Sequence, residues 1–223
     1  MNSVPNIDSS IIEAFKKLDT TSVSDALDRL GITGGLLGIK PVVNDTTICG
    51  QAFTVHYVPC GSVKGTVGDF LDDVKPGQVV VIDNSGRDYC TVWGDLMAIT
   101  ATRMGIAGTV IDGVCRDIPA IKKIKYPIFT KGTYMVTGKD RVFVDAVNVP
   151  VAVSGVQVKP GDIILGDETG VLVIPVERAE EVLKVSLEIA QKEAIIEEAI
   201  RNGASLREAR AKAGYHQLQT RKA

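Results

Sequence analysis

Residues 93–117, WGDLMAITATRMGIAGTVIDGVCRD, form the stretch that decides the fold of this chain. The first part predicts a short helix over residues 95–104, because apolar and small residues recur at helical spacing and Gly105 suits the left-handed residue that ends many helices. The positions expected to pack inward are Leu96, Ile99, Thr100 and Met104. The second part is an apolar run, residues 109–111, which predicts a strand that ends at Asp112.

A second strand is predicted just before this stretch. Residues 78–83, QVVVID, are a continuous β-branched run between Pro-Gly and Asn-Ser-Gly, as is typical of a strand buried on both faces. Strand, helix and strand make a βαβ unit, and ligands of open α/β sheets bind beyond the carboxyl ends of the strands. Residues 84–95 and 113–117 occupy these ends and are the candidate site.

Charged side chains gather at these two strand ends: Asp83, Arg87, Asp88, Asp95, Asp112, Arg116 and Asp117. Aspartate oxygens suit Mg²⁺ or Mn²⁺, and the arginine fork suits a carboxylate or phosphate. The first hypothesis is therefore a divalent metal site that faces an anionic small molecule. The alternative is that Asp117 only caps a helix that begins at Ile118, with Arg116 as a solvated neighbour.

The runs GDLM at residues 94–97 and GTVIDGVCRD at residues 108–117 resemble the signature of the RraA-like family. This family includes the class II 4-hydroxy-4-methyl-2-oxoglutarate/4-carboxy-4-hydroxy-2-oxoadipate aldolases. The resemblance extends to VSDALDRLG at residues 23–31 and PGDIILGD at residues 160–167, so it covers nearly the whole chain.

The resemblance implies an α/β fold of the swivelling β/β/α type. The whole chain, residues 1–223, would form a single domain with a central mixed sheet and flanking helices. Residues 1–32 would supply the N-terminal helices, and residues 176–223 would form a C-terminal helical segment with one long helix. The resemblance also implies assembly into trimers or dimers of trimers.

The resemblance also assigns roles within the site. Asp117 would anchor Mg²⁺ or Mn²⁺, largely through water, and Arg116 would bind the oxo-acid oxygens and stabilise the enolate. Backbone N–H groups at the start of the helix would bind the substrate carboxylate. The residues assigned to this last role are Gly94, Asp95, Leu96 and Met97.

At two acidic positions the sequence allows either a role in the site or a purely structural role. Asp95 matches an acidic position of the family and would ligate a metal-bound water or position the water that moves protons, but the helix dipole alone also favours an acid there. A further acid is expected from the C-terminal helix of an adjacent subunit. Glu193 is the candidate; Glu197 and Glu198 are close, and any of the three could be a solvated helix face.

These assignments predict a metal-dependent lyase. Cleavage or decarboxylation of a 2-oxo acid needs stabilisation of the pyruvate enolate, by a lysine Schiff base or by a divalent metal. The lysines lie mostly in polar contexts, so the metal route is favoured. We expect cleavage of 4-hydroxy-4-methyl-2-oxoglutarate-type acids, with oxaloacetate decarboxylation as a further activity. The polar loop at residues 84–91 differs from the form typical of these aldolases, so the identity of the substrate is not fixed by the resemblance. The alternative function is that of a noncatalytic regulator that binds ribonuclease E or another protein.

The overall composition excludes several classes of protein. The chain has 223 residues, a formal net charge of −2 and 45% hydrophobic residues, enough for a substantial core and without a general attraction to nucleic acid or membranes. No apolar run approaches the roughly 20 residues of a membrane span, and the start lacks the pattern of a secretory signal, so a cytoplasmic location is expected. The cysteines are scattered, without the spacing of a zinc site: Cys49, Cys60, Cys90 and Cys115.

Periodicity and turn residues predict the other elements. Helices are expected over residues 9–18 and 22–30, the second with Ser22 and Asp25 as a capping box. His56 lies inside a strand and is interpreted as structural. The predicted strands cover residues 47–58, 127–130, 149–158 and 162–174, and the last helices cover residues 177–202 and 205–210.

Overall fold

The computed structural model describes residues 7–214, and its centre is a sheet whose four middle strands are parallel. These strands lie in the order β5-β4-β3-β2, and the β3-α3-β4 unit predicted from sequence is present. The parallel strands are β2 (Ile48–Pro59), β3 (Val79–Thr91), β4 (Gly108–Cys115) and β5 (Ile128–Thr133).

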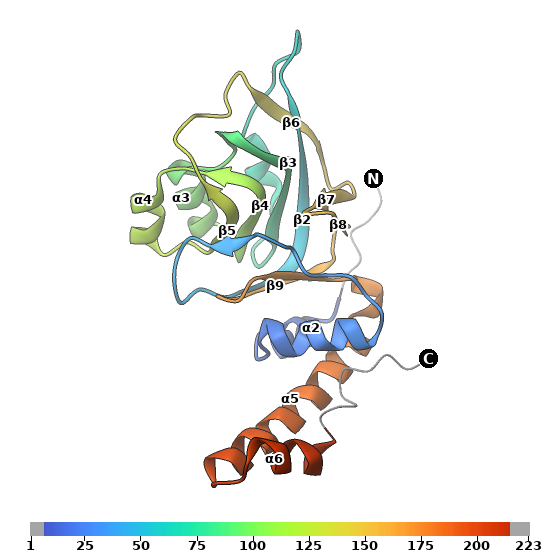
Figure 1. Cartoon of the computed structure of the whole chain (residues 1–223). Helices are drawn as coiled ribbons and strands as arrows, with labels where there is room; N and C mark the ends of the chain where they lie inside the picture. Colours follow the sequence, from blue (N-terminus) through green and yellow to red (C-terminus); the bar gives the residue numbers. More distant parts are fainter. Residues whose placement is uncertain (1–6, 215–223) are drawn as a thin grey trace.

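Antiparallel strands extend this sheet, so the predicted mixed sheet is confirmed (Figure 1). Residues 34–41 link its two ends, because Leu36 bonds to Val171 of the last strand and Pro41 pairs with Phe129 of β5. The central sheet is therefore nearly closed. The added strands are β1 (Lys40–Pro41), β6 (Val142–Val147), β9 (Ile163–Gly166) and β10 (Val171–Ile174); β7 (Val151–Val153) and β8 (Val156–Val158) form a separate hairpin.

The helices lie in two groups (Figure 1). Two short helices, α3 (Asp95–Arg103) and α4 (Ile118–Ile124), pack beside the parallel strands. The other group lies beyond β9, and its long helix leads away from the sheet. This group comprises α1 (Ser9–Phe15), α2 (Thr20–Arg29), α5 (Ala179–Arg201) and α6 (Leu206–Ala213), and short 3₁₀ turns lie at Asp69–Asp73 and Val176–Arg178. Within residues 7–214, no helix combines the length and apolar character that a membrane crossing requires.

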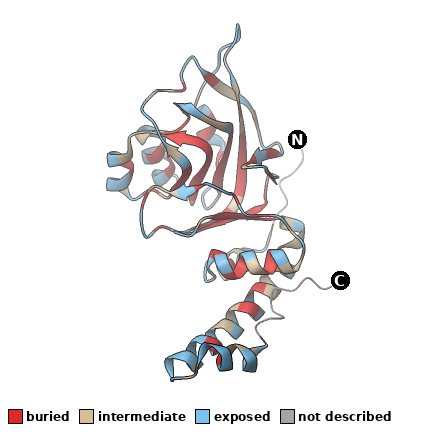
Figure 2. Ribbon diagram, viewed as in Figure 1, coloured by how far each residue is buried: buried red, intermediate tan, exposed pale blue. Residues whose placement is uncertain are grey.

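The side chains of strand β3 alternate between two separate apolar clusters of the core. Val80 and Ile82 pack in the apolar cluster that includes residues of α3 and α4, whereas Val79 and Val81 pack in a cluster with the β7-β8 hairpin. All four side chains are fully buried, as is the centre of the sheet in Figure 2. The alternation also decides where the next side chain points, because Asp83 continues the row of Val79 and Val81.

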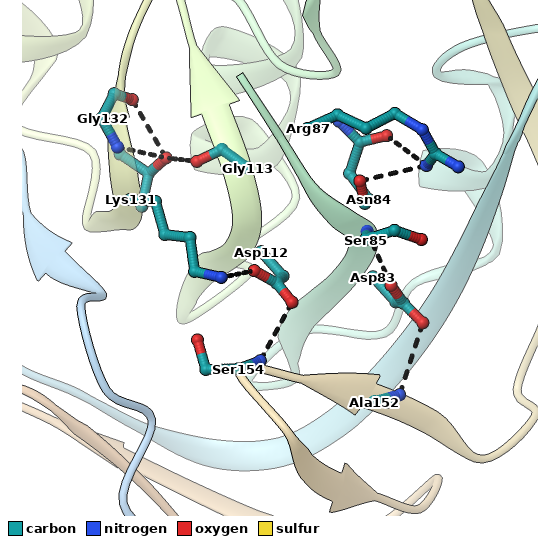
Figure 3. A network of polar contacts seen from close by, with 11 residues as sticks. Asp83, Asn84, Ser85, Arg87, Asp112, Gly113, Lys131, Gly132, Ala152 and Ser154 are labelled. Atoms are coloured by element: carbon teal, nitrogen blue, oxygen red, sulfur yellow. Dashed lines mark hydrogen bonds and ion pairs between the residues drawn. The ribbon is translucent and has the colours of Figure 1, made fainter.

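Asp83 and Asp112 belong to a structural network on the hairpin side of the sheet (Figure 3). The Asp83 carboxylate accepts hydrogen bonds from the N–H groups of Ser85, at 2.8 Å, and Ala152, at 3.3 Å. Asp112 accepts one from the N–H of Ser154, at 2.9 Å, and forms an ion pair with Lys131 at 2.5 Å. These two carboxylates therefore bind the β7-β8 hairpin to the strand ends.

Arg87 belongs to the same region of β3. Its guanidinium donates to the Asn84 carbonyl at 3.0 Å and to the Tyr57 carbonyl at 3.3 Å. The seven charged residues predicted at the strand ends therefore do not all face one site, because the pleat directs Asp83 and Asp112 to the hairpin side. The predicted loop at residues 84–91 is also a continuation of β3, with register shifts against β4.

The inward face of α3 differs from the predicted stripe. Ala98 and Ala101 are fully buried, whereas the Leu96 and Ile99 side chains are 75% and 50% exposed. The helix approaches the sheet through its small residues, with Met104 packed at its end. The size of the apolar side chains was thus a poor guide to the buried face.

The cap of α2 also differs from the prediction. Asp19 is the N-cap residue, and its carboxylate accepts a hydrogen bond from the N–H of Ser22 at 2.6 Å. The helix therefore begins two residues earlier than the expected capping box of Ser22 and Asp25. The long helix α5 is present as predicted, and the large apolar side chains of Leu187 and Ile195 on it are exposed.

Replacement of Asp83 by Ala should lower the free energy of unfolding by about 2 kcal/mol, because two backbone N–H groups lose a buried acceptor. Urea denaturation measures this change. Asp88→Ala, which removes an exposed carboxylate from the same strand, is the matched control and should have little effect. Equal stability of the two variants would contradict the structural role of Asp83.

Candidate active site

A cavity of about 410 Å³ lies where β3 and β4 give way to α3 and α4. It thus occupies the carboxyl ends of two parallel strands, as the sequence predicted. Three segments and one arginine line it: residues 65–68, residues 91–97, Thr137 with Lys139, and Arg116.

Asp117 has an unusual backbone at the start of α4. Its φ of 60° and ψ of 35° lie in the left-handed region, and its side chain makes no capping hydrogen bond to α4. Its Oδ2 atom instead accepts a hydrogen bond from the N–H of Asp95, at 3.2 Å, at the first residue of α3. The alternative in which Asp117 only caps its own helix is therefore wrong, because the carboxylate faces the neighbouring helix.

Gly94 makes this approach possible. A Cβ atom at residue 94 would lie 2.5 Å from Oδ2 of Asp117 and 3.3 Å from Nε of Arg116. No side chain fits at these distances unless the carboxylate moves. The glycine predicted to bind substrate thus also makes room for the two charged groups that follow β4.

Arg116 lies beside the carboxylate. Its Nε atom is 3.4 Å from Oδ2 of Asp117, and its backbone N–H donates to the Trp93 carbonyl at 3.1 Å. The Arg116 side chain is 41% exposed and lines the cavity, and that of Asp117, which lies beside Arg116, is 36% exposed. An anionic ligand in the cavity can therefore meet the guanidinium.

The first turn of α3 has fewer available donors than the sequence suggested. The N–H of Asp95 is donated to Asp117, and the N–H of Leu96 is donated to Oδ1 of Asp95 at 2.8 Å. Within residues 7–214, the N–H groups of Gly94 and Met97 have no acceptor. These two donors are therefore the ones that a ligand carboxylate can use.

The donor set limits how a metal ion could bind. No three His, Cys, Asp or Glu side chains in the described part of the chain are grouped closely enough to hold one. Asp117 offers a single hard oxygen ligand with an exposed face, beside a cavity with room for water and substrate. Mg²⁺ commonly binds through one or two carboxylates and keeps several waters, so this arrangement fits Mg²⁺ or the similar Mn²⁺.

Glu193 lies elsewhere in the chain. It is on α5, 3.4 Å from the Ser22 hydroxyl of α2, and it lines a different cavity together with Glu197. Burial and the nearby charges of Asp25 and Asp19 raise the pKa of Glu193. Within one chain Glu193 does not line the candidate site, and its reach into an adjacent subunit stays a prediction.

Cys115 and His56 both have structural surroundings, and for His56 this agrees with the interpretation from sequence. Cys115 is fully buried, and this burial raises the pKa of its thiol to about 12, so it does not supply a thiolate nucleophile near neutral pH. His56 lies 3.3 Å from the Asp145 carboxylate across the β2-β6 pair, away from the residues that line the cavity.

The sequence prediction missed Thr137 and Lys139. They lie between β5 and β6, on a segment fixed to the end of β3 by a hydrogen bond of 2.9 Å from the Thr91 N–H to the Val136 carbonyl. The only local signal is Gly138, where a Cβ would lie 2.4 Å from the Thr91 carbonyl oxygen. A single glycine in a loop was too weak a signal to place these residues in the site.

Comparison with known proteins identifies related sequences. The model of the RraA-like family, described as Aldolase/RraA, matches residues 20–173. Protein DlpA of Legionella pneumophila is 41% identical over 220 residues, which are 97% of this chain and 35% of DlpA, so the chain spans about a third of that relative. A protein of Halalkalibacterium halodurans, named "Putative 4-hydroxy-4-methyl-2-oxoglutarate aldolase", is 38% identical over a region that covers 78% of this chain and 80% of that protein.

Solved structures share the fold. An uncharacterised protein from Pseudomonas syringae superposes with a TM-score of 0.87 at 43% identity, over 92% of this chain and 99% of that one. RraAS2 of Streptomyces coelicolor is described as an unusual member of the RNase ES inhibitor RraA protein family. It superposes with a TM-score of 0.79 at 28% identity, over 85% of this chain and 96% of that one. The family match, the shared fold and the site at the ends of β3 and β4 agree, and this chain belongs to the RraA-like family.

Proposed function

We propose that this protein is a divalent-metal-dependent carbon–carbon lyase that releases pyruvate from 4-hydroxy-4-methyl-2-oxoglutarate-type 2-oxo acids. One observation carries the proposal: the left-handed backbone of Asp117 directs its carboxylate toward the first turn of α3, beside Arg116 and a cavity. The name of the Halalkalibacterium halodurans relative supports the same reaction class.

Asp117 would hold Mg²⁺ or Mn²⁺ together with water and the substrate. The ion, when bound, polarises the 2-oxo group of the substrate as a Lewis acid. The carboxylate is restrained by the Asp95 N–H and the Arg116 guanidinium. The protein thus supplies an oriented anionic ligand without a larger cluster of acids.

Arg116 binds the oxygen on which negative charge develops. When the substrate carbon–carbon bond breaks, the electron pair passes to the 2-oxo group, and a fixed guanidinium stabilises the enolate more than the neutral ketone. The free N–H groups of Gly94 and Met97 bind the adjacent carboxylate at the positive end of α3.

Asp95 positions the water that moves protons. That water takes the proton from the C4 hydroxyl, the C3–C4 bond breaks, and the carbonyl product forms at C4. The remaining fragment is the pyruvate enolate, which takes a proton at C3 from the same water. With oxaloacetate the C3–C4 bond breaks in the same way and C4 leaves as CO₂, so the same residues serve decarboxylation.

The alternative function is a noncatalytic regulator that binds ribonuclease E or another protein. Such a protein needs a surface, but it does not need Arg116, Asp117 and the start of α3 to meet at a cavity. We therefore favour the enzyme. We further propose a cytoplasmic location and no binding to nucleic acid or membranes, from the balanced charge of the chain.

Pyruvate release from oxaloacetate and from 4-hydroxy-4-methyl-2-oxoglutarate tests the proposal. Release should require Mg²⁺ and stop with excess EDTA, after correction for decarboxylation by metal alone. Asp117→Ala should lower both activities about 100-fold or more, because both need the same metal ligand. Asp28→Ala removes an exposed carboxylate from α2 and should leave both unchanged.

Two results would contradict this account. Absence of release above the metal blank would favour the regulator, and loss of one activity alone in Asp117→Ala would show that the two reactions do not share a site.

Gly94→Ala should raise the Mg²⁺ concentration needed for half-maximal pyruvate release about tenfold, because the new Cβ displaces Oδ2 of Asp117. Gly61→Ala is the control, since a Cβ there meets no atom within 4 Å. A metal titration of pyruvate release compares the two. An unchanged Mg²⁺ requirement in Gly94→Ala would show that the position of this carboxylate does not control metal binding.

We also propose that the chain assembles as a trimer or a dimer of trimers, with an acid from α5 of one subunit completing the site of the next. The exposed Leu187 and Ile195 on α5 and Leu206 on α6 support an interface at these helices. Glu193 is the preferred acid, and Glu197 and Glu198 are the alternatives.

Light scattering should give three or six times the mass of the chain. Glu193→Ala should lower kcat about tenfold or more without a change in mass, whereas Glu180→Ala, near the start of α5, should not. The same substitution at Glu197 and Glu198 distinguishes the three acids. A monomer in solution, or full activity in all three variants, would contradict the shared site.

A further inference from the structure

A second cavity, of about 560 Å³, lies at the opposite end of β4 from the candidate active site. Ala107, the last residue before β4, lines this second cavity, whereas Arg116, the first residue after β4, lines the active-site cavity. Because a strand rises about 3.3 Å per residue, the length of β4 separates the two cavities by roughly 25 Å. The other lining segments are residues 16–19, between α1 and α2, residues 47–49, at the start of β2, and residues 165–167, at the end of β9.

The strand side of the second cavity is apolar. Ile48 and Leu165 are 2% and 3% exposed, and both belong to the paired backbone of β2 and β9. Cys49, the residue opposite Leu165, directs its thiol to the Ile12 carbonyl, 3.7 Å away, and burial raises the pKa of this thiol to about 12. The thiol is therefore uncharged near neutral pH and adds to the apolar surface. This side of the cavity favours a ligand with an apolar body.

The two carboxylates that line the second cavity are bound to the start of α2. Asp19 accepts a hydrogen bond from the N–H of Ser22 at 2.6 Å. Asp167 accepts from both the N–H and the hydroxyl of Thr20, each at 2.8 Å. Burial raises the pKa of Asp167, but its hydrogen bonds with Thr20 and Thr169 outweigh burial and hold the pKa below its ordinary value. Both acids therefore already have partners, and the positive end of the α2 dipole offsets their charge.

Two donors at the mouth of the second cavity have no partner within residues 7–214. They are the ammonium of Lys17 and the hydroxyl of Thr47, both on exposed residues. The neighbouring Lys16 also lines the cavity, but its ammonium is paired with Glu13 at 2.6 Å. Lys17 can therefore bind an anionic ligand without losing an existing ion pair. The free side-chain groups at the mouth are thus donors, which suit a negatively charged group.

We propose that this second cavity is a binding site for a small monoanion with an apolar body, such as an aromatic or branched-chain carboxylate. The apolar body lies against β2 and β9, and the carboxylate lies at the mouth, where Lys17 and Thr47 donate to it. The cavity volume falls within the roughly 300–1,000 Å³ of small-molecule sites, whose walls are mostly apolar with a few polar groups that orient the ligand. The site is independent of the proposed lyase function, because it lies at the other end of β4.

A bound ligand of this kind joins two parts of the fold. Residues 16–19 link two helices, whereas residues 48–49 and 165–166 lie in the sheet. These segments meet only in the folded chain, so the ligand binds the folded state and raises the Tm as its concentration increases. An anionic ligand gains the contact with Lys17, and a neutral molecule of the same shape therefore binds more weakly.

The matched pair 2-naphthoate and 2-naphthamide tests the site, because the two molecules share a ring system and differ in charge. Methyl NMR with EDTA present should show shifts at Ile48, Ala107 and Leu165 when millimolar 2-naphthoate is added. Met97, which lines the active-site cavity, should show none. The affinity for 2-naphthoate should exceed that for 2-naphthamide about fivefold or more, and the Tm should rise more with the anion.

Two substitutions in the cavity test its parts separately. Lys17→Met should lower the affinity for 2-naphthoate to that for 2-naphthamide, and Lys17→Arg should keep the difference, because it keeps the charge. Lys123→Met is the matched control, since it removes an exposed lysine charge from α4 and does not alter the cavity. Ala107→Leu enlarges a side chain that lines the cavity and should weaken the binding of both molecules.

Three results would overturn the proposal. Shifts confined to Met97 would place the ligand in the active-site cavity, and the absence of shifts at Ile48, Ala107 and Leu165 would show that the second cavity does not bind it. Equal affinity for 2-naphthoate and 2-naphthamide, or unchanged 2-naphthoate binding in Lys17→Met, would reject a site for anions. Because EDTA is present and no substrate is cleaved, these outcomes are independent of pyruvate release.

Discussion

The hydrogen bond between the Asp117 carboxylate and the first N–H of α3 is the interaction on which the site depends. A left-handed backbone at a residue with a side chain costs about 1–2 kcal/mol, so it persists only where its surroundings hold it. Here the Arg116 guanidinium and the Asp95 N–H hold the carboxylate, and Gly94 leaves the space that it fills. The strained residue thus joins the ends of two adjacent βα connections.

The sheet separates structural charges from those of the site. Parallel strands bring Asp83, Asp112 and Asp117 to the same edge, but the pleat directs the first two to the β7-β8 hairpin. There they accept backbone hydrogen bonds that would otherwise be lost when the hairpin packs on the sheet. Asp117 lies beyond the last residue of β4, where the chain turns into α4, and its carboxylate faces α3. On one face of the sheet, the carboxylates of Asp83 and Asp112 therefore hold the hairpin against the strand ends. The cavity lies on the other side of these strand ends.

The central βαβ unit and the edge where the site lies could be predicted from periodicity, and the resemblance to the RraA-like family named Asp95, Arg116 and Asp117. The buried face of α3 could not, because Ala98 and Ala101 are buried by close approach and not by size. The direction of the Asp117 side chain depends on a positive φ that an aspartate does not reveal. Lys139 lines the cavity because its segment contacts Thr91, about fifty residues away in the chain, and only the tertiary structure shows this contact.

The central claim is that Asp117 and Arg116 together bind a metal ion and a 2-oxo acid in one complex. Oxalate resembles the pyruvate enolate, and the paramagnetic resonance signal of Mn²⁺ reports how much of the ion is bound. Oxalate should tighten Mn²⁺ binding to the protein, and Arg116→Ala should abolish this effect while Mn²⁺ alone still binds. If oxalate leaves Mn²⁺ binding unchanged, or binds equally well without the metal, the two residues do not form the site described.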